Sequence, residues 1–71
     1  MTQIKSTMAG TVFTVNVAIE EEVVEGQVVI VLESMKMEIP IEAESAGKVI
    51  AINAQVGDFV NEGDVLVTLG E

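Results

Sequence analysis

The sequence contains no cysteine, histidine, tryptophan, tyrosine or arginine. Without cysteine the chain has no disulfide, no thiolate metal ligand and no thiol nucleophile. Without histidine it lacks the side chain that most often serves general acid–base catalysis, and without arginine it lacks the one that binds phosphate through paired hydrogen bonds. The remaining residues offer no nucleophile–base pair and no cluster of metal ligands. We therefore expect a protein that is not itself an enzyme and holds no metal ion.

Positive charge and long apolar runs are scarce as well. Lys5, Lys36 and Lys48 stand against 12 acidic residues, and the formal net charge is −9 at pH 7. This balance makes nucleic acid and anionic membranes unfavourable partners. The longest apolar run, Val28–Leu32, is far shorter than the roughly 20 residues of a membrane-spanning helix, and residues 1–10 contain no apolar signal core. We expect a cytoplasmic protein.

What the chain does have is small aliphatic side chains. It is 71 residues long and 49% hydrophobic, but only 3% of its residues are aromatic. We therefore expect a single domain, residues 1–71, with a core of Val, Ile, Leu, Ala and Met. A domain of this size buries roughly 60% of the surface of its unfolded chain, which leaves little room for a deep catalytic cleft.

The chain also contains an internal repeat. Residues 9–33 align without a gap onto residues 46–70, with nine identical pairs that include glycines and an asparagine. Each copy has a strand-like run, a turn-rich stretch and a second strand-like run, and no window shows helical periodicity. Neither copy can bury its apolar face alone. We therefore predict two copies packed face to face in a small all-β sandwich or flattened barrel with quasi-twofold symmetry.

The segment 34–45 links the two copies and has no counterpart in this alignment. Strand-like stretches flank the tetrapeptide Ser34-Met35-Lys36-Met37, which predicts a hairpin with Lys36 near its tip. Pro40 lies in the second stretch and donates no backbone hydrogen bond, so that strand must lie at a sheet edge or at an irregularity.

The lysine between two methionines has two interpretations. An exposed lysine is usually a solvated charge, and methionines two residues apart often fill gaps in a core. A lysine amine on an exposed turn is also accessible to an enzyme that deprotonates and acylates it, and flanking thioethers would give that enzyme an apolar surface to bind. Lys5 and Lys48 have no such neighbours, so for these two the first interpretation holds.

Residues 33–37, Glu-Ser-Met-Lys-Met, resemble the Glu-Ala-Met-Lys-Met motif of biotin carboxyl carrier domains. The resemblance covers residues 8–70, because it continues through Met8–Val12, Ser45–Gly47, Gly57–Val60 and Glu62–Leu66. The chain is most similar to small free-standing biotin/lipoyl attachment proteins. The repeat leaves no room for the inserted "thumb" of some carrier domains, so the chain resembles the thumbless type.

The resemblance implies a barrel-sandwich hybrid of two quasi-twofold-related four-stranded halves, with the modified lysine on a hairpin turn. It implies that biotin protein ligase attaches biotin covalently to Lys36, and that Met35 and Met37 serve recognition, with Glu33 and Ser34 as weaker parts of the motif. The implied function is that of a non-catalytic carrier, monomeric as an isolated domain. Its biotin carries a carboxyl group from a biotin carboxylase site to a carboxyltransferase site.

Two alternatives stay open. A lipoyl carrier for 2-oxoacid dehydrogenases or glycine cleavage would have the same fold, with lipoate on Lys36, and dual modification is compatible with the resemblance to small attachment proteins. Lipoyl domains, however, typically flank the lysine with Asp or Thr and a small residue, in place of Met35 and Met37. An unmodified β-sandwich used for protein contacts would leave the Met-Lys-Met run without a purpose.

The sequence departs from the family pattern at two positions. Ser34 replaces the commoner alanine, which is a mild change. Glu20 stands where the second copy has Gly57, so we expect strain in the first turn and predict that Glu20→Gly stabilises the protein. Among the other acids, Asp58, Asp64 and Glu62 are better explained as turn residues than as ligands of a calcium ion.

Overall fold

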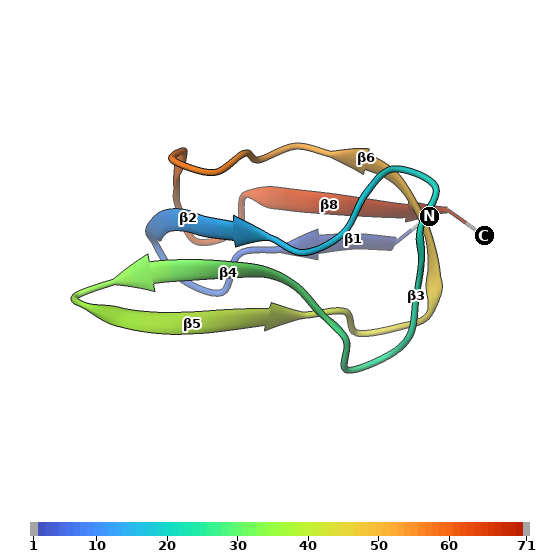
Figure 1. Cartoon of the computed structure of the whole chain (residues 1–71), viewed down its shortest axis with the longest axis horizontal. Helices are drawn as coiled ribbons and strands as arrows, with labels where there is room; N and C mark the ends of the chain where they lie inside the picture. The colour runs from blue at the N-terminus through green and yellow to red at the C-terminus, as the bar shows by residue number, and fades with distance from the viewer. Residues whose placement is uncertain (1, 71) are drawn as a thin grey trace.

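In the computed structural model, which describes residues 2–70, all regular structure is β-strand (Figure 1). None of these residues lies in a helix long and apolar enough to cross a membrane. The strands in chain order are β1 (Thr2–Lys5), β2 (Gly10–Val15), β3 (Glu22–Val23), β4 (Val28–Ser34), β5 (Met37–Glu42), β6 (Gly47–Ile52), β7 (Phe59–Val60) and β8 (Val65–Gly70).

The strands form two four-stranded antiparallel sheets that enclose one core. Sheet A has the order β1-β8-β6-β3, and sheet B has the order β5-β4-β2-β7. The predicted all-β fold, a flattened barrel or sandwich of two quasi-twofold-related halves, is therefore confirmed. Pro40 lies on β5, at an edge of sheet B, where its missing N–H breaks no ladder, as predicted.

The quasi-twofold axis relates the strands through the same offset of 37 residues as the sequence repeat. It takes β2, β3 and β4 onto β6, β7 and β8, and also β1 onto β5. Residues 39–42 of β5 therefore correspond to β1, and the prediction that the whole segment 34–45 has no counterpart is wrong. The alignment missed this pair because only Ile4 and Ile41 share a side chain.

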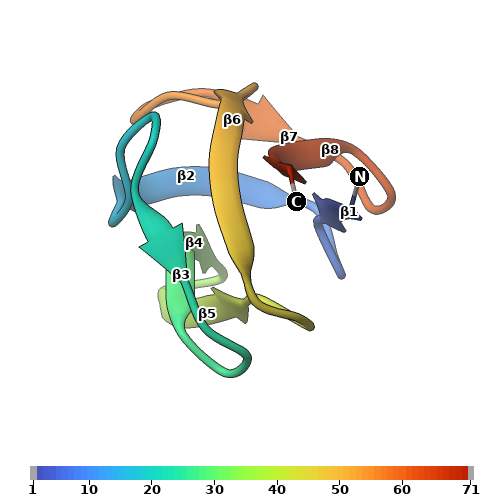
Figure 2. The ribbon, with the colours of Figure 1, turned by 90° about the vertical axis from the view of Figure 1, so that its right-hand side faces the viewer.

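Neither sheet is built from one copy alone. The short strand β3 of the first copy pairs with β6 of the second (Figure 2), and β7 of the second copy pairs with β2 of the first. Each copy thus contributes its short strand to a sheet that the other copy completes. The sequence did not reveal this exchange, because both stretches are rich in turn residues.

The core is aliphatic and lies between the inner faces of the two sheets. Its most buried members come from symmetry-related positions such as Val12 and Val49, or Leu32 and Leu69, each at most 1% exposed. Methionine contributes less than predicted: among the described residues only Met8 packs against the core, and it is only partly buried. Alternating β-branched residues supply the core instead, because one face of each strand is buried.

The turns between the short strands repeat as well. Glu20 and Gly57 occupy the same position, with φ values of 75° and 95° and backbone N–H groups bonded to the carbonyls of Val49 and Val12. Asp58 accepts a hydrogen bond from the N–H of Gln55 at 2.9 Å, which confirms the prediction that it serves a turn. Asp64 does the same for Asn61 at 2.8 Å. The prediction of an unfavourable backbone angle at Glu20 is confirmed.

Candidate functional site

The β4–β5 hairpin has the shortest loop that a β-hairpin commonly has. Ser34 pairs with Met37, so Met35 and Lys36 alone form the loop. Their φ values are 52° and 65°. Two consecutive positive φ values define a type I′ turn, whose twist matches that of the flanking strands. Lys36 therefore lies at the tip of a regular hairpin, as the sequence predicted.

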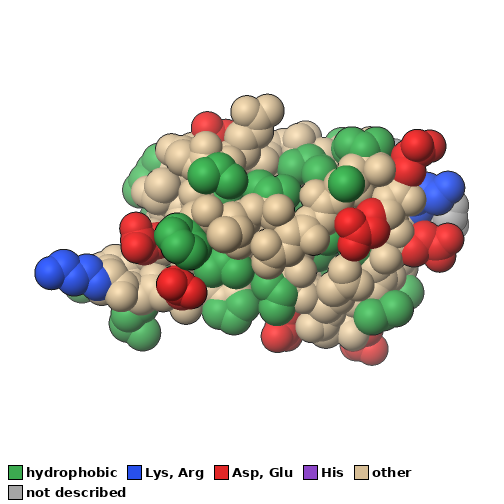
Figure 3. All heavy atoms as spheres, viewed as in Figure 1, with side chains coloured by type: hydrophobic (Ala, Val, Ile, Leu, Met, Phe, Trp, Pro, Cys, Tyr) green, Lys and Arg blue, Asp and Glu red, His purple; other side chains and the backbone are tan. Residues whose placement is uncertain are grey.

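The side chains at this tip are unusually exposed. Met35 is 92% exposed and Met37 64%, so neither fills a gap in the core, and that interpretation is wrong. Lys36 is exposed as well. The hairpin protrudes from the body of the molecule, with basic side-chain atoms at its end (Figure 3). The sequence places two apolar side chains in water beside a lysine, with no benefit to the core.

The backbone of the loop is strained. Type I′ turns favour Asn-Gly, because other residues resist positive φ values. A left-handed conformation costs a non-glycine residue about 1–2 kcal/mol, and both Met35 and Lys36 bear this cost. Strain of this kind persists where the surrounding structure imposes it, and it is concentrated at functional sites. Here the paired strands β4 and β5 impose it.

Acidic residues lie just below the tip. Glu33 on β4 pairs with Glu38 on β5, and both side chains are exposed. Two like charges directly opposite one another destabilise a sheet. Ser34 is half-buried and pairs with Met37. The structure thus brings together all five residues of the Glu33–Met37 run, and it adds Glu38, which sequence reasoning had not singled out.

The other two lysines lie elsewhere. Lys5 is on β1 and Lys48 on β6, both strands of sheet A. Lys48 pairs with Glu22 across β3 and β6, an opposite-charge pair that stabilises the sheet. Lys36 alone among the three projects from a loop and has methionines on both sides. Chemically, the tip offers one primary amine to an external active site.

The β4–β5 hairpin thus presents the Lys36 amine on a strained turn at one end of a small β-domain. The model of the biotin/lipoyl family, described as "Biotin-requiring enzyme", matches residues 2–69. The chain therefore belongs to this family.

Individual relatives agree with this assignment. The chain is 52% identical, over 62 residues, to the "Biotin/lipoyl attachment protein" of Bacillus subtilis (strain 168), and the match covers 87% of this chain and 85% of that protein. Among solved structures it resembles part of the urea carboxylase of Kluyveromyces lactis, with a TM-score of 0.91 and 30% identity. It also resembles part of a single-chain, multi-domain long-chain acyl-CoA carboxylase, with a TM-score of 0.86 and 29% identity. The first likeness covers 97% of this chain and 6% of the urea carboxylase, and the second covers 93% and 7%.

Proposed function

We propose that this protein is a biotin carboxyl carrier whose attachment residue is Lys36. The observation that carries the proposal is the exposed Met35-Lys36-Met37 run on a strained two-residue turn. Nothing in the fold requires methionines there, and a turn chosen for stability alone would carry Asn-Gly. The arrangement fits a covalently attached acyl group, since Nζ of an exposed lysine on a projecting loop is open to an enzyme and leaves room for a long arm.

The residues of the tip have separate tasks in this proposal. Lys36 supplies the amine that forms the amide bond, and its exposure lets biotin protein ligase reach it. Met35 and Met37 give the ligase an apolar surface on either side of the amine. Biotin, once bound, supplies the ureido nitrogen that carries the carboxyl group. The paired strands β4 and β5 hold the attachment point in one place, so that the arm moves and its anchor does not.

The proposed partners are biotin protein ligase, a biotin carboxylase and a carboxyltransferase. The two structural relatives are carboxylases by name, which supports this choice. The domain itself acts as a non-catalytic tether. By holding biotin close to both active sites it raises the effective concentration of the cofactor there without forming new contacts. We expect the isolated domain to be a cytoplasmic monomer.

A second candidate is a lipoyl carrier. It is favoured by one observation, the 52% identity to a protein named for both biotin and lipoyl attachment. Biotin remains our first proposal, because lipoyl domains typically carry Asp or Thr and a small residue in place of Met35 and Met37.

The test is the intact mass of the protein after co-expression with a biotin protein ligase, followed by peptide mapping of Lys5, Lys36 and Lys48. One biotinyl group on Lys36 alone is the expected result, and Lys36→Arg is the control that should abolish it. Lipoyl groups without biotin, in cells supplied with lipoate, would favour the second candidate. Absence of both groups would contradict the carrier function.

A further inference from the structure

The internal repeat allows each exposed apolar residue to be compared with its equivalent in the other half. If the fold requires an apolar side chain at a position, the equivalent position 37 residues away should be apolar as well. Phe13 and Ile50 are both apolar and both 45% exposed, so this position follows the fold. Ile19 and Val56 behave in the same way, at 53% and 66%. These exposed side chains need no further explanation.

Two exposed apolar residues break this symmetry, Val24, whose equivalent is Asn61, and Phe59; of the two, Phe59 lies in a row that leads to the lysine hairpin. It is 66% exposed on β7, and its equivalent on β3 is Glu22. The two residues occupy the same register, because Glu22 pairs with Lys48 and Phe59 pairs with Thr11, the equivalent of Lys48. The fold therefore accepts a charged residue at this position. A largely exposed phenylalanine here gains little from the core.

Phe59 also lies in a row that leads to the lysine hairpin. Thr11 pairs with Phe59 on one side and Glu33 on the other, and Glu33 pairs with Glu38. Directly paired residues of neighbouring antiparallel strands point to the same face of a sheet. Glu38, Glu33, Thr11 and Phe59 thus cross the outer face of sheet B in one line, and all four are exposed.

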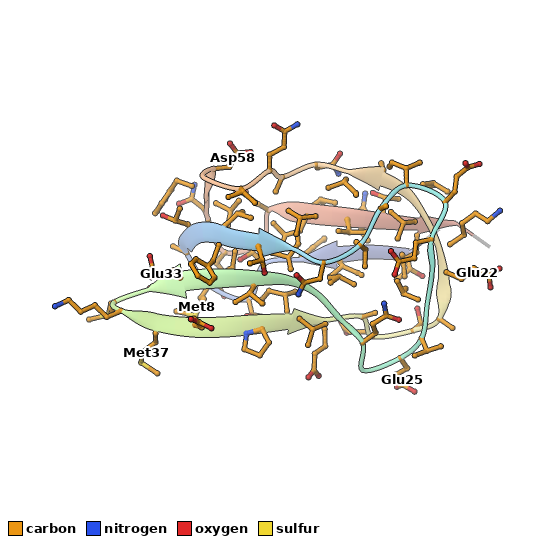
Figure 4. All side chains as sticks on the ribbon, in the orientation of Figure 1. Met8, Glu22, Glu25, Glu33, Met37 and Asp58 are labelled. Carbon is orange, nitrogen blue, oxygen red and sulfur yellow. The ribbon has the colours of Figure 1, made fainter. Side chains whose placement is uncertain are left out.

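The hairpin end of the molecule therefore differs from the opposite end. Apolar and acidic side chains lie next to one another at the base of the hairpin (Figure 3). Asp58, Glu33 and Met37 lie toward this end, and Glu22 and Glu25 lie at the opposite end (Figure 4). In the equivalent row of sheet A, the paired residues Lys48 and Glu22 carry opposite charges. In sheet B, the paired residues Glu33 and Glu38 carry like charges, and the exposed Phe59 lies in the same row beyond Thr11.

A protein centred on Lys36 would cover this row. Glu33, which lies in the same row as Phe59, is three residues from Lys36, or about 10 Å along the strand direction. Two strand spacings from β4 to β7 add about 10 Å at right angles, so Phe59 lies about 14 Å from Lys36 at the tip. A standard interface of about 800 Å² per partner has a radius of about 16 Å. Phe59 falls inside that area.

We propose that Phe59, with Glu33 and Glu38 in the same row, forms a docking surface for the enzyme that acylates Lys36. The inference rests on the function proposed above. The matching surface of that enzyme is an apolar recess beside basic groups, which receive the two carboxylates. The acylating enzyme is the occupant because its substrate is the bare Nζ at the end of a four-carbon stem, so its active site must approach the hairpin closely. Enzymes that use the lengthened arm work farther from the domain.

The test measures the steady-state kinetics of biotin transfer by a purified biotin protein ligase to the whole chain. Phe59→Gln is expected to lower kcat/KM about tenfold, mainly through KM, as expected for a truncated interface anchor. Phe59→Leu, which keeps an apolar side chain, should retain most of the rate. Val24→Asn is the matched control, since Val24 is 63% exposed and its repeat equivalent is Asn61. It should react like the wild type, and melting temperatures should show that all variants are folded.

The outcomes separate this inference from the proposed function. No biotin on wild-type Lys36 would mean that the function itself is wrong. Normal labelling of Phe59→Gln, alongside a labelled wild type, would overturn the docking surface alone. Equal losses in Phe59→Gln and Val24→Asn would overturn it too, because they would show a general effect of surface change. A normal labelling rate with slower carboxyl transfer to an acceptor would assign the surface to a carboxylase and refute the occupant proposed here.

Discussion

The substitution Glu20→Gly is expected to stabilise the protein, because Glu20 is a non-glycine residue with a φ of 75°. A left-handed backbone costs such a residue about 1–2 kcal/mol. Glycine avoids this cost but loses about 0.5–1 kcal/mol more conformational freedom on folding. The net gain in the free energy of unfolding is then about 0.5–1 kcal/mol. The turn itself should persist, since the equivalent N–H of Gly57 bonds the carbonyl of Val12 at 2.9 Å, as that of Glu20 bonds Val49 at 2.8 Å.

Charge has to be separated from backbone strain in this prediction, because Glu20 precedes Glu21 and Glu22. Glu20→Gln removes the charge and keeps the strain, so it is the matched control. Thermal unfolding followed by circular dichroism measures the difference, and a gain of 1 kcal/mol corresponds to about 4–8 °C in a domain of this size. Glu20→Gly should melt above both the wild type and Glu20→Gln.

The second half of the molecule offers the reverse experiment. Gly57 has a φ of 95°, and a Cβ added there would meet nothing within 4 Å. Gly57→Ala therefore tests the backbone angle without a steric clash, and should cost about 1 kcal/mol. A Glu20→Gly variant no more stable than Glu20→Gln, or a neutral Gly57→Ala, would refute the reasoning from φ.

Three further predictions concern the hairpin. Lys36→Ala should abolish biotin labelling. It should leave the melting temperature nearly unchanged, since an exposed side chain on a loop changes stability by less than about 0.5 kcal/mol. An unfolded variant would contradict the placement of Lys36 at the tip. Met35→Ala and Met37→Ala should slow labelling by the ligase far more than they lower the melting temperature, and the reverse pattern would show that the methionines support the fold. Replacing Met35-Lys36 with Asn-Gly should raise the free energy of unfolding by about 1 kcal/mol or more, because the new residues favour the type I′ turn; chemical denaturation measures it, and a loss of stability would show that the turn is not strained.

The sequence predicted the fold class and the position of Lys36 because both depend on local patterns. Alternating β-branched residues mark the strands, and a gapless repeat implies equivalent halves. Met35 and Lys36 fall between two strand-like runs, which is enough to place them in a hairpin loop. Glu20 was recognised as strained by comparison with Gly57, without any coordinates.

Features that depend on pairing between distant residues were harder to predict from the sequence. The two-residue strands β3 and β7 have no periodicity of their own, since they exist only by pairing with β6 and β2. The row from Glu38 to Phe59 joins four strands, and no spacing in the sequence reveals it. The repeat did contain one signal for Phe59, its substitution by Glu22 in the first copy, but the register was needed to interpret it.

The exchange of β3 and β7 between the copies has a consequence for how the domain unfolds. Each sheet is completed by a strand from the opposite copy, so neither half can separate without opening both sheets. Because each half holds a strand of the other, we expect the two halves to unfold together in a single cooperative event. The β4–β5 hairpin belongs to sheet B, so it is expected to lose its pairing in the same event and not on its own.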